Sequence, residues 1–468
     1  MSGSEFPPDP NPHRPYPSDP GLEAALAPWA LRRTLTRVDV ELINTGSELL
    51  LGRILNTHQQ WLGRRLADLG RPVSRQVTVP DRSHDIEAAV REALGRADLV
   101  ITTGGLGPTG DDLTRERIAN LLGRRLIHSP EIEDRIRGYF ASRGRPVPAR
   151  THVETYVPEG ARVLVNRHGT ASGLAFHLAS NPYRPEGRDS WLVLLPGPPR
   201  ELHPMFEREL VPLLDQVLPV GDGFRSLTFK TTGIGESNME ERLLAPLTPL
   251  MVAGLEVGYC ARIGEVDVRF VGRGPHGAHW IEQATAELQK AAGEFIFGQG
   301  DDTLELVVVR ELTRRGLTLA LAESCTGGHV ANRITNIPGA SAILRAGFVT
   351  YSNESKSSAL GVASDLIAAH GAVSEPVARA MAEGARRSGG ADYGLSLTGI
   401  AGPDGGSDEK PVGTVFIGLA GPEGTTVTRQ ANRFDRETFK YASAQQALDS
   451  LRRRILGLPP IPDRVHRS

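Results

Sequence analysis

Ser324 lies in the segment Glu-Ser-Cys-Thr-Gly-Gly, residues 323–328, between a predicted strand at 317–322 and a predicted helix at 329–334. A hydroxyl at the head of a helix, with glycines beside it, faces backbone N–H donors that can stabilise an oxyanion. Serine becomes a good nucleophile only when a base takes its proton. No histidine lies in the motifs of this region, so Lys356 is the candidate base, since burial lowers the pKa of a lysine. These residue types predict acyl transfer by a serine–lysine pair.

Each of these residues also has an ordinary structural interpretation. Ser324 could serve only as a helix N-cap, and Lys356 could be a surface lysine. Cys325 could itself be the nucleophile, or only a small buried side chain. Thr398 and Gly399 could form only a strand-to-loop turn. Three loops rich in glycine and hydroxyl residues within about 160 residues nevertheless favour a catalytic site.

A second candidate site is the glycine-rich segment 103–114, which joins a predicted strand at 98–103 to a helix beginning near residue 113. Glycines let successive N–H groups face an anion, and a helix N-terminus favours phosphate. Asp111 and Asp112 could hold a divalent metal that bridges phosphate oxygens. The pattern predicts a nucleotide or pyrophosphate site. The alternative is that the glycines make only a tight turn and that Asp112 only caps the helix.

Two further turns support the functional interpretation. Gly46-Ser47-Glu48 follows a predicted strand at 38–43, and Asp81 follows another at 76–79. Strands that alternate with helices, here at 56–69 and 83–94, predict a parallel sheet with right-handed crossovers, and Ser83 is the expected N-cap of the second helix. Ligands bind such sheets at the carboxyl ends of the strands, where these turns lie.

The chain is long enough for several domains, since its 468 residues exceed what one hydrophobic core supports. Seven of the first twenty residues are proline, which predicts a disordered extension. The strand at 191–195 is expected to be the last of the first domain, residues 225–232 and 265–272 are strands of a small α+β unit, and a helix at 304–315 opens the third. The expected boundaries are 1–36 for the extension and 37–212, 222–298 and 300–460 for the domains.

Bulk composition limits the class of protein. The two cysteines, Cys260 and Cys325, form neither a metal motif nor a disulfide framework, and a reduced, cytoplasmic compartment fits. No apolar run approaches about 20 residues, and no signal peptide opens the chain, so a soluble protein without membrane contact is expected. The net charge of −2 gives no global reason to bind nucleic acid, and small-molecule substrates fit better.

At the glycine-rich segment the chain resembles a known fold. Residues 102–105 (Thr-Thr-Gly-Gly), 112–114 (Asp-Leu-Thr) and 196–201 (Pro-Gly-Pro-Pro-Arg-Glu) are similar to the molybdopterin-binding fold. Residues 45–52 (Thr-Gly-Ser-Glu-Leu-Leu-Leu-Gly), with Asn56-Thr57, narrow the resemblance to the N-terminal domain of the CinA family of competence/damage-inducible proteins. The resemblance implies a three-layer α/β domain with metal-dependent ADP-ribose pyrophosphatase activity.

The same resemblance implies site residues for this activity, with Mg, Mn or Co as the divalent metal. The resemblance implies that Asp81 and Asp112 are functional aspartates, and with Asp111 from the glycine-rich segment they are the expected metal residues. The implied substrate residues are Gly46, Glu48, Asn56, Gly104, Gly105, Gly107 and Thr109. One departure stands out, because the family usually carries Lys or Arg followed by Gln where this chain has Val153-Glu154. If that cation neutralises substrate phosphate, the activity is weakened or lost.

Residues 232–237 and 264–269 resemble the small KH-type domain of the same family. A KH module that binds nucleic acid clamps the backbone with a GXXG loop. No such loop flanked by Lys or Arg is expected between residues 222 and 298. We therefore interpret this unit as a spacer or dimerisation module.

Four segments closely resemble the CinA C-terminal domain, which is similar to nicotinamide mononucleotide (NMN) deamidases: residues 322–328, 351–356, 371–374 and 398–406. The resemblance implies that Ser324 is the nucleophile, Lys356 its general base, Tyr351 a positioning or activating group, and Thr398 a support for the oxyanion or substrate. It further implies a substrate site made by Cys325, Thr326, Gly327, Gly399 and Arg436, with Arg436 on the phosphate. The expected reaction converts NMN and water to nicotinate mononucleotide and ammonia, and this half of the protein needs no cofactor.

Partners are implied only by the resemblance. A homodimer is expected, and a recombination protein such as RecA is a possible partner of the family. An accessory protein of competence or the DNA-damage response, with little catalysis, is therefore the competing hypothesis. A molybdopterin-processing protein is a third, which the serine domain and the Thr45-Gly46-Ser47-Glu48 signature disfavour. No direct contact with nucleic acid is predicted, because the sequence has no basic stripe or aromatic platform.

Overall fold

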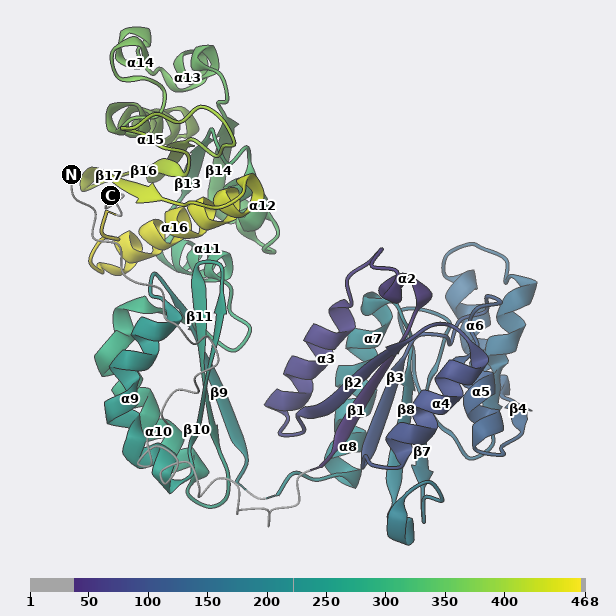
Figure 1. The fold of residues 1–468 in the computed structure, drawn as a ribbon. Helices are drawn as coiled ribbons and strands as arrows, with labels where there is room; N and C mark the ends of the chain where they lie inside the picture. The colour runs from purple at the N-terminus through teal and green to yellow at the C-terminus, as the bar shows by residue number, and fades with distance from the viewer. Residues whose placement is uncertain (1–37, 222, 464–468) are drawn as a thin grey trace, which may run out of the picture. The chain divides into compact units, whose positions relative to one another are not determined.

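The computed structural model describes residues 38–221 and 223–463, apart from the side chain of Glu186. The proline-rich extension expected at 1–36 lies outside these residues. The chain divides into two compact units, one ending at Gly221 and one continuing from residue 222 (Figure 1).

The first unit contains a six-stranded sheet with the order β2-β1-β3-β8-β7-β6. β2, β1, β3 and β8 run parallel, whereas β7 pairs antiparallel with both β8 and β6. The prediction of a parallel sheet is therefore wrong at this edge, because β7 returns to β8 through a loop and not through a helical crossover. The strands are β1 (Val40–Thr45), β2 (Val73–Val79), β3 (Leu99–Thr103), β6 (Arg162–Leu164), β7 (Gly173–Leu178) and β8 (Ser190–Leu195), and a separate hairpin pairs β4 (Leu126–His128) with β5 (Tyr156–Pro158).

Helices cover both faces of this sheet and make a three-layer α/β domain (Figure 1). One face packs against α3, α7 and α8 through a core that includes Leu62, Leu66 and Phe206, and the other packs against α4 and α5 through Ile86, Val90 and Ile118. The helical segments are α2 (Ser47–Leu50), α3 (Thr57–Asp68), α4 (Ser83–Leu94), α5 (Thr114–Leu121), α6 (Pro130–Ala141), η2 (Ala149–Thr155), η3 (Pro185–Gly187), α7 (Pro199–Met205), η4 (Phe206–Leu210) and α8 (Val211–Val217).

The N-cap predicted for α4 is one residue off. Arg82 occupies the cap position with extended backbone and no capping side chain, and Ser83 is the first helical residue. Asn56, in contrast, caps α3, since its Oδ1 accepts from the N–H of Gln59 at 3.1 Å. Parallel strands β1, β2 and β3 end side by side at Thr45, Val79 and Thr103, which brings the three predicted turns to one edge.

The second unit begins with a four-stranded antiparallel sheet of order β10-β11-β9-β12. α9 and α10 pack on it through a core that includes Phe229, Leu243, Phe270 and Leu288. The elements are β9 (Arg225–Thr232), α9 (Glu236–Ala253), β10 (Glu256–Arg262), β11 (Glu265–Gly272), α10 (Gly277–Ala292), η5 (Gly293–Phe295) and β12 (Ile296–Gln299).

The expectation that this part lacks a basic-flanked GXXG segment is wrong. Residues 274–277 read Gly-Pro-His-Gly and follow Arg273. The segment joins β11 to α10, and the guanidinium of Arg273 lies 3.0 Å from Glu256. The absence of such a loop therefore cannot support the spacer interpretation, which stays a prediction.

The rest of the second unit is a mixed five-stranded sheet of order β14-β13-β15-β16-β17. β14, β13 and β15 are parallel, and β16 and β17 continue antiparallel. α11, α12 and α16 pack on one face and α13, α14 and α15 on the other (Figure 1). The elements are α11 (Leu304–Arg315), β13 (Leu319–Glu323), α12 (His329–Thr335), η6 (Ala340–Ala342), β14 (Leu344–Val349), α13 (Asn353–Leu360), α14 (Ser364–His370), α15 (Glu375–Gly389), β15 (Tyr393–Gly399), β16 (Thr414–Gly421), β17 (Gly424–Ala431) and α16 (Arg436–Leu456).

No helix within the described residues is both long enough and apolar enough to cross a membrane. The predicted fold class, an α/β domain, a small α+β linker and a second α/β domain, is confirmed.

Candidate functional sites

Ser324 and Lys356 are brought together at the carboxyl ends of two neighbouring parallel strands, β13 and β14, of the second-unit sheet. Ser324 follows β13, and its N–H donates to the Leu397 carbonyl of β15 at 3.0 Å. Lys356 lies on α13, just after β14, and its Nζ is 3.2 Å from Ser324 Oγ. Ser324 is partly exposed, so the hydroxyl is reachable from solvent. The N-cap of α12 is Gly328, which rules out the alternative that Ser324 is only that cap.

Lys356 is almost completely buried, with 1% of its surface exposed. Burial lowers the pKa of its ammonium, because the charged form loses solvation. Its Nζ donates to the Thr350 carbonyl at 2.9 Å, and within the described part of the chain no carboxylate forms an ion pair with it. A lysine in this setting loses its proton more readily than one on the surface, as a general base requires.

Cys325, the competing nucleophile, is buried and points into the hydrophobic core. Burial raises the pKa of its thiol to about 12, so the nucleophilic thiolate is scarce at neutral pH. The structure therefore favours Ser324 over Cys325 as the attacking group.

Glu323 fixes the turn that presents Ser324, a role that the sequence analysis missed. Its buried carboxylate accepts from the N–H groups of Gly328, Val330 and Ala331 at 3.0, 3.1 and 2.8 Å. These are donors at the start of α12 that have no intrahelical partner. A glutamate directly before Ser324 and six residues before the start of α12 was the available signal.

Arg436 and Tyr351 form a second pair beside the serine. Arg436 is the first residue of α16, and it donates to the Tyr351 hydroxyl at 2.7 Å and to the Gly402 carbonyl at 2.8 Å. Both side chains are exposed. The Tyr351 hydroxyl therefore faces Arg436, and the contact of this residue with Lys356 is made by its carbonyl, at 3.5 Å from Nζ.

The remaining predicted residues of this site line the turns around Ser324. The Thr398 hydroxyl donates to the Ala372 carbonyl at 2.8 Å, so its proton is used and its role here is to hold a neighbouring loop. Gly399 ends β15 next to it. Thr326 is fully buried, and Gly327 is exposed between Ser324 and α12.

In the first unit, most of the predicted phosphate-site residues line one cavity of about 380 Å³ at the strand ends. Gly105 is required there, because a Cβ on it would lie 2.1 Å from the Thr114 hydroxyl at a φ of +68°. His58, which the sequence analysis missed, also lines the cavity and bonds to the Gly197 carbonyl. The predicted residues on its wall are Gly46, Glu48, Asn56, Asp81, Gly104, Gly105, Asp111 and Asp112, while Gly107 and Thr109 lie in the same loop behind it.

The three aspartates do not form a ready metal centre. Asp81 Oδ2 accepts from the Ser47 N–H at 2.8 Å, and Thr109 Oγ1 lies 2.5 Å from Asp111 and 2.6 Å from Asp112. Over residues 38–221 and 223–463, no three His, Cys, Asp or Glu side chains are grouped closely enough to hold a metal ion. These residues do not fit a metal held by the protein alone.

The departure at Val153-Glu154 has two different consequences. Val153 is exposed, whereas Glu154 is buried, with 2% of its surface exposed. Burial raises the pKa of Glu154 to about 7, against smaller opposing effects of the Thr170 hydroxyl, at 3.1 Å, and of Arg115. The glutamate therefore adds a titrating group near Asp112.

Comparisons with known proteins bear on the whole chain. Residues 41–216 match the probable molybdopterin binding domain, 226–298 the damage-inducible protein CinA KH domain, and 301–455 the CinA C-terminal domain. A CinA-like protein of Akkermansia muciniphila is 43% identical over 418 residues, covering 89% of this chain and 97% of that one. A putative competence-damage inducible protein of Symbiobacterium thermophilum is 44% identical over 437 residues, covering 89% and 99%. A crystal structure of a competence/damage inducible protein from Agrobacterium tumefaciens is 40% identical over 32% of this chain and 91% of that one, with a TM-score of 0.30.

The fold and the sites together define a multidomain α/β protein with a glycine-loop cavity in its first unit and a serine–lysine pair in its second unit. The chain belongs to the CinA family of competence/damage-inducible proteins.

Proposed function

We propose that the C-terminal domain is an NMN deamidase, which converts NMN and water to nicotinate mononucleotide and ammonia. The observation that carries the proposal is the 3.2 Å approach of Lys356 Nζ to Ser324 Oγ, with the lysine buried and the serine reachable. This is the geometry of a nucleophile and its base.

The chemistry follows in two steps. Neutral Lys356 takes the Ser324 proton as Oγ attacks the carboxamide carbon, and the lysine then returns the proton to the departing ammonia. Water next attacks the resulting ester, with Lys356 accepting a water proton and restoring the Ser324 hydroxyl. In the described structure, the N–H groups of Cys325 and Thr326 donate to no backbone carbonyl but approach the Cys325 thiol, a weak acceptor that an oxyanion would replace as their partner.

Arg436 supports the choice of a phosphorylated substrate. Two of its donors are held by Tyr351 and Gly402, and the guanidinium remains exposed beside the serine turn. A fixed planar guanidinium suits a phosphate, because it offers donors in pairs.

The test is whether the full chain forms nicotinate mononucleotide from NMN, with the product measured by chromatography. Ser324→Ala and Lys356→Met should each remove product formation, whereas Cys325→Ala should keep it. Full activity of Ser324→Ala together with loss of activity in Cys325→Ala would identify Cys325 as the nucleophile. No product from the wild-type chain would favour the competing hypothesis, an accessory protein that acts through partners such as a recombination protein.

We propose a second activity, hydrolysis of ADP-ribose or a related pyrophosphate, for the cavity of the first unit. Eight predicted residues from three strand ends meet on its wall, and its volume suits part of a nucleotide. If a divalent ion takes part, phosphate oxygens and water must supply most of its ligands, as is common for Mg²⁺. The test is AMP release from ADP-ribose by the wild-type chain and by Asp112→Asn, each with and without added Mg²⁺, Mn²⁺ or Co²⁺.

A further inference from the structure

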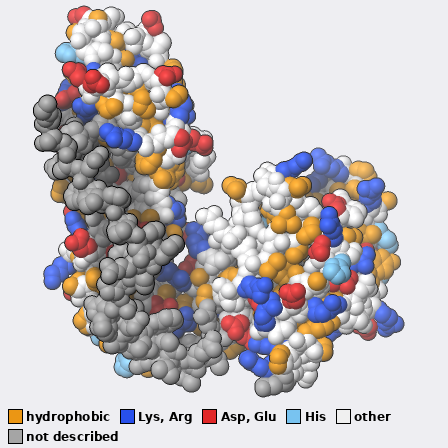
Figure 2. Space-filling view, viewed as in Figure 1, with side chains coloured by type: hydrophobic (Ala, Val, Ile, Leu, Met, Phe, Trp, Pro, Cys, Tyr) orange, Lys and Arg blue, Asp and Glu red, His pale blue; other side chains and the backbone are white. Residues whose placement is uncertain are grey.

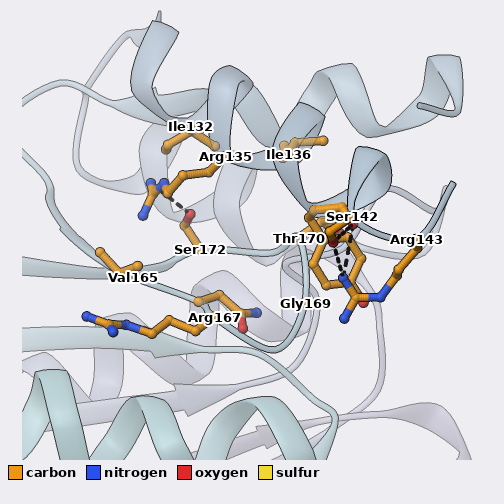
Figure 3. A pocket seen from close by; sticks show the side chains of 12 residues that line it. Ile132, Arg135, Ile136, Ser142, Arg143, Val165, Arg167, Gly169, Thr170 and Ser172 are labelled. Atoms are coloured by element: carbon orange, nitrogen blue, oxygen red, sulfur yellow. Dashed lines mark hydrogen bonds between the residues drawn. The ribbon is translucent and has the colours of Figure 1, made fainter. Parts of the chain in front are cut away.

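A groove with six arginines among its lining residues lies in the first unit, separate from the proposed pyrophosphatase cavity. It consists of a cavity of about 790 Å³ and a smaller one of about 280 Å³, which share Tyr139, Arg143, Gly169 and Thr170. Figure 3 shows the smaller cavity, with Arg135 and Arg143 on one side and the segment that contains Arg167 on the other. We call this the arginine groove, and its arginines are Arg135, Arg143, Arg145, Arg150, Arg167 and Arg200.

The positive charge of the groove is only partly compensated, since Glu131 and Glu209 attract Arg135 without forming an ion pair with it. Over the described side chains, none of these arginines except Arg200 forms an ion pair, and Arg200 only approaches Glu201, at 3.8 Å. Glu201 is the one carboxylate on the groove wall among the described residues, and burial raises its pKa. Clustered like charges repel one another, so an anion that enters the groove relieves this repulsion.

Several groove residues are already held in place. The guanidinium carbon of Arg143 lies 3.7 Å from the centre of the Tyr139 ring, and its Nη1 donates to the Tyr139 carbonyl at 3.0 Å. Arg135 reaches the Ser172 hydroxyl at 3.5 Å, the contact drawn in Figure 3. Arginines that are ordered before a ligand arrives lose less entropy on binding it.

The part of the groove wall around Glu201 is also held in place by hydrogen bonds and close packing. Glu201 accepts from the Asn166 side-chain amide at 2.8 Å, and that amide also donates to the Ala171 carbonyl. Gly169 passes so close that a Cβ on it would lie 2.1 Å from Glu201 Oε2. The segment that carries Arg167 is thus anchored to the segment that carries Arg200.

We propose that the arginine groove binds a ligand with a di- or triphosphate group, at a site distinct from the cavity beside Asp81 and Asp112. The two cavities share no lining residue, although Pro108 of the groove belongs to the same loop as Gly105 and Asp111. Several guanidinium groups around one space suit several phosphates, because each can bind two phosphate oxygens. The open groove has room for a small molecule, and Phe140 on the wall offers an apolar face for a base.

Calorimetric titration of the full chain with inorganic tripolyphosphate, and separately with ATP, tests the proposal. Arg145→Ala/Arg150→Ala should weaken binding of both by about tenfold or more, because each substitution removes a phosphate contact. The matched control, Arg75→Ala/Arg91→Ala, removes two exposed arginines of the same unit outside the groove and should change the dissociation constant by less than about twofold. Tighter binding of ATP than of tripolyphosphate would identify a nucleotide ligand, and equal binding would identify the phosphate chain alone as the ligand.

Three results would overturn the proposal. The first is no binding of either probe, and the second is equal weakening in the groove variant and the control. The third is a single-stranded oligonucleotide that binds more tightly than both probes and depends on Arg145 and Arg150, since the groove would then be a nucleic-acid surface. Asn56→Ala changes an uncharged residue in the cavity beside Asp81 and Asp112, and it should leave binding of both probes unchanged. Loss of binding in Asn56→Ala would place the ligand in that cavity and not in the arginine groove. All these variants should still deamidate NMN. Loss of binding in the arginine groove can therefore be distinguished from loss of the proposed deamidase activity.

Discussion

Lys356 Nζ lies 3.2 Å from Ser324 Oγ and 2.9 Å from the Thr350 carbonyl, with almost none of the lysine exposed. A buried ammonium without a carboxylate partner is costly, and the cost lowers its pKa. The folded state therefore keeps a lysine that releases its proton more easily than a surface lysine does. In the proposed mechanism, this lysine serves as the base for Ser324, in a region whose motifs contain no histidine.

The pH dependence of deamidation should report this lysine. The reactive form is neutral, so kcat/KM should rise with pH through the lowered pKa of Lys356 and then level off. Lys356→Arg should be inactive at every pH, because arginine does not deprotonate in this range. Initial rates between about pH 6 and 10 check this. A profile that is flat across that range would remove Lys356 from the role of base.

Removal of the Arg436 guanidinium should weaken recognition of the substrate phosphate. Arg436→Ala should lower kcat/KM for NMN roughly 30-fold, since a charged hydrogen bond contributes about 2 kcal/mol. The loss should be much smaller with nicotinamide riboside, which has no phosphate. Arg433→Ala, an exposed arginine three residues earlier, is the matched control and should leave both rates unchanged. An equal loss for both substrates would show that Arg436 acts on the fold or on Tyr351 instead.

Glu323 should matter for both stability and rate. Glu323→Ala leaves three N–H groups at the start of α12 without their acceptor, which should cost about 3 kcal/mol or more and displace Ser324. Thermal unfolding and the deamidation rate at low temperature, where the variant is still folded, are the measurements. Glu282→Ala, on the exposed surface of α10, is the control and should change neither. An unchanged melting temperature of Glu323→Ala would show that water accepts the hydrogen bonds that the Glu323 carboxylate normally accepts.

The sequence predicts some elements to the residue and misses others for physical reasons. The helix predicted at 304–315 is α11, because Thr303 caps its start and Gly316, in the left-handed region, ends it. Both signals are local. The antiparallel edge of the first sheet, the bonds of Glu323 and the grouping of arginines in one groove depend on segments that meet only in three dimensions. The glycine turns on the wall of the cavity beside Asp81 and Asp112 follow from the sequence because parallel strand ends must converge, whereas Glu48 and Asn56 follow only from the family resemblance. The hydrogen bond between Arg436 and the Tyr351 hydroxyl was not predicted, because side-chain direction has no sequence signature.

Glu154 should make the first unit less stable as pH rises. Its folded-state pKa, about 7, lies above that of an ordinary glutamate, so its contribution to stability is lost as pH rises from about 4.5 through 7. Glu154→Gln removes the charge and should stabilise the protein by roughly 2 to 3 kcal/mol at pH 8, with little effect at pH 5. Unfolding midpoints at the two pH values measure this. Glu159→Gln, an exposed neighbour, should have no such effect, and a Glu154→Gln gain that does not depend on pH would contradict the argument.

A chelator should separate the two proposed activities. The serine–lysine chemistry needs no metal, so EDTA should leave deamidation of NMN unchanged. Release of AMP from ADP-ribose, if it depends on Asp81 and Asp112 through a divalent ion, should fall to background and return when Mg²⁺, Mn²⁺ or Co²⁺ is added. Loss of deamidation in EDTA would contradict the proposed mechanism of the C-terminal domain.

The most direct test of the central claim is to trap the acyl-enzyme. Wild-type protein is quenched with acid during turnover of NMN, and the peptides are analysed by mass spectrometry. The account predicts a nicotinate mononucleotide ester on Ser324 that is absent from Ser324→Ala. An adduct on Cys325 instead, or steady turnover with no adduct on either residue under conditions that slow hydrolysis of the ester, would contradict the claim that Ser324 is the nucleophile.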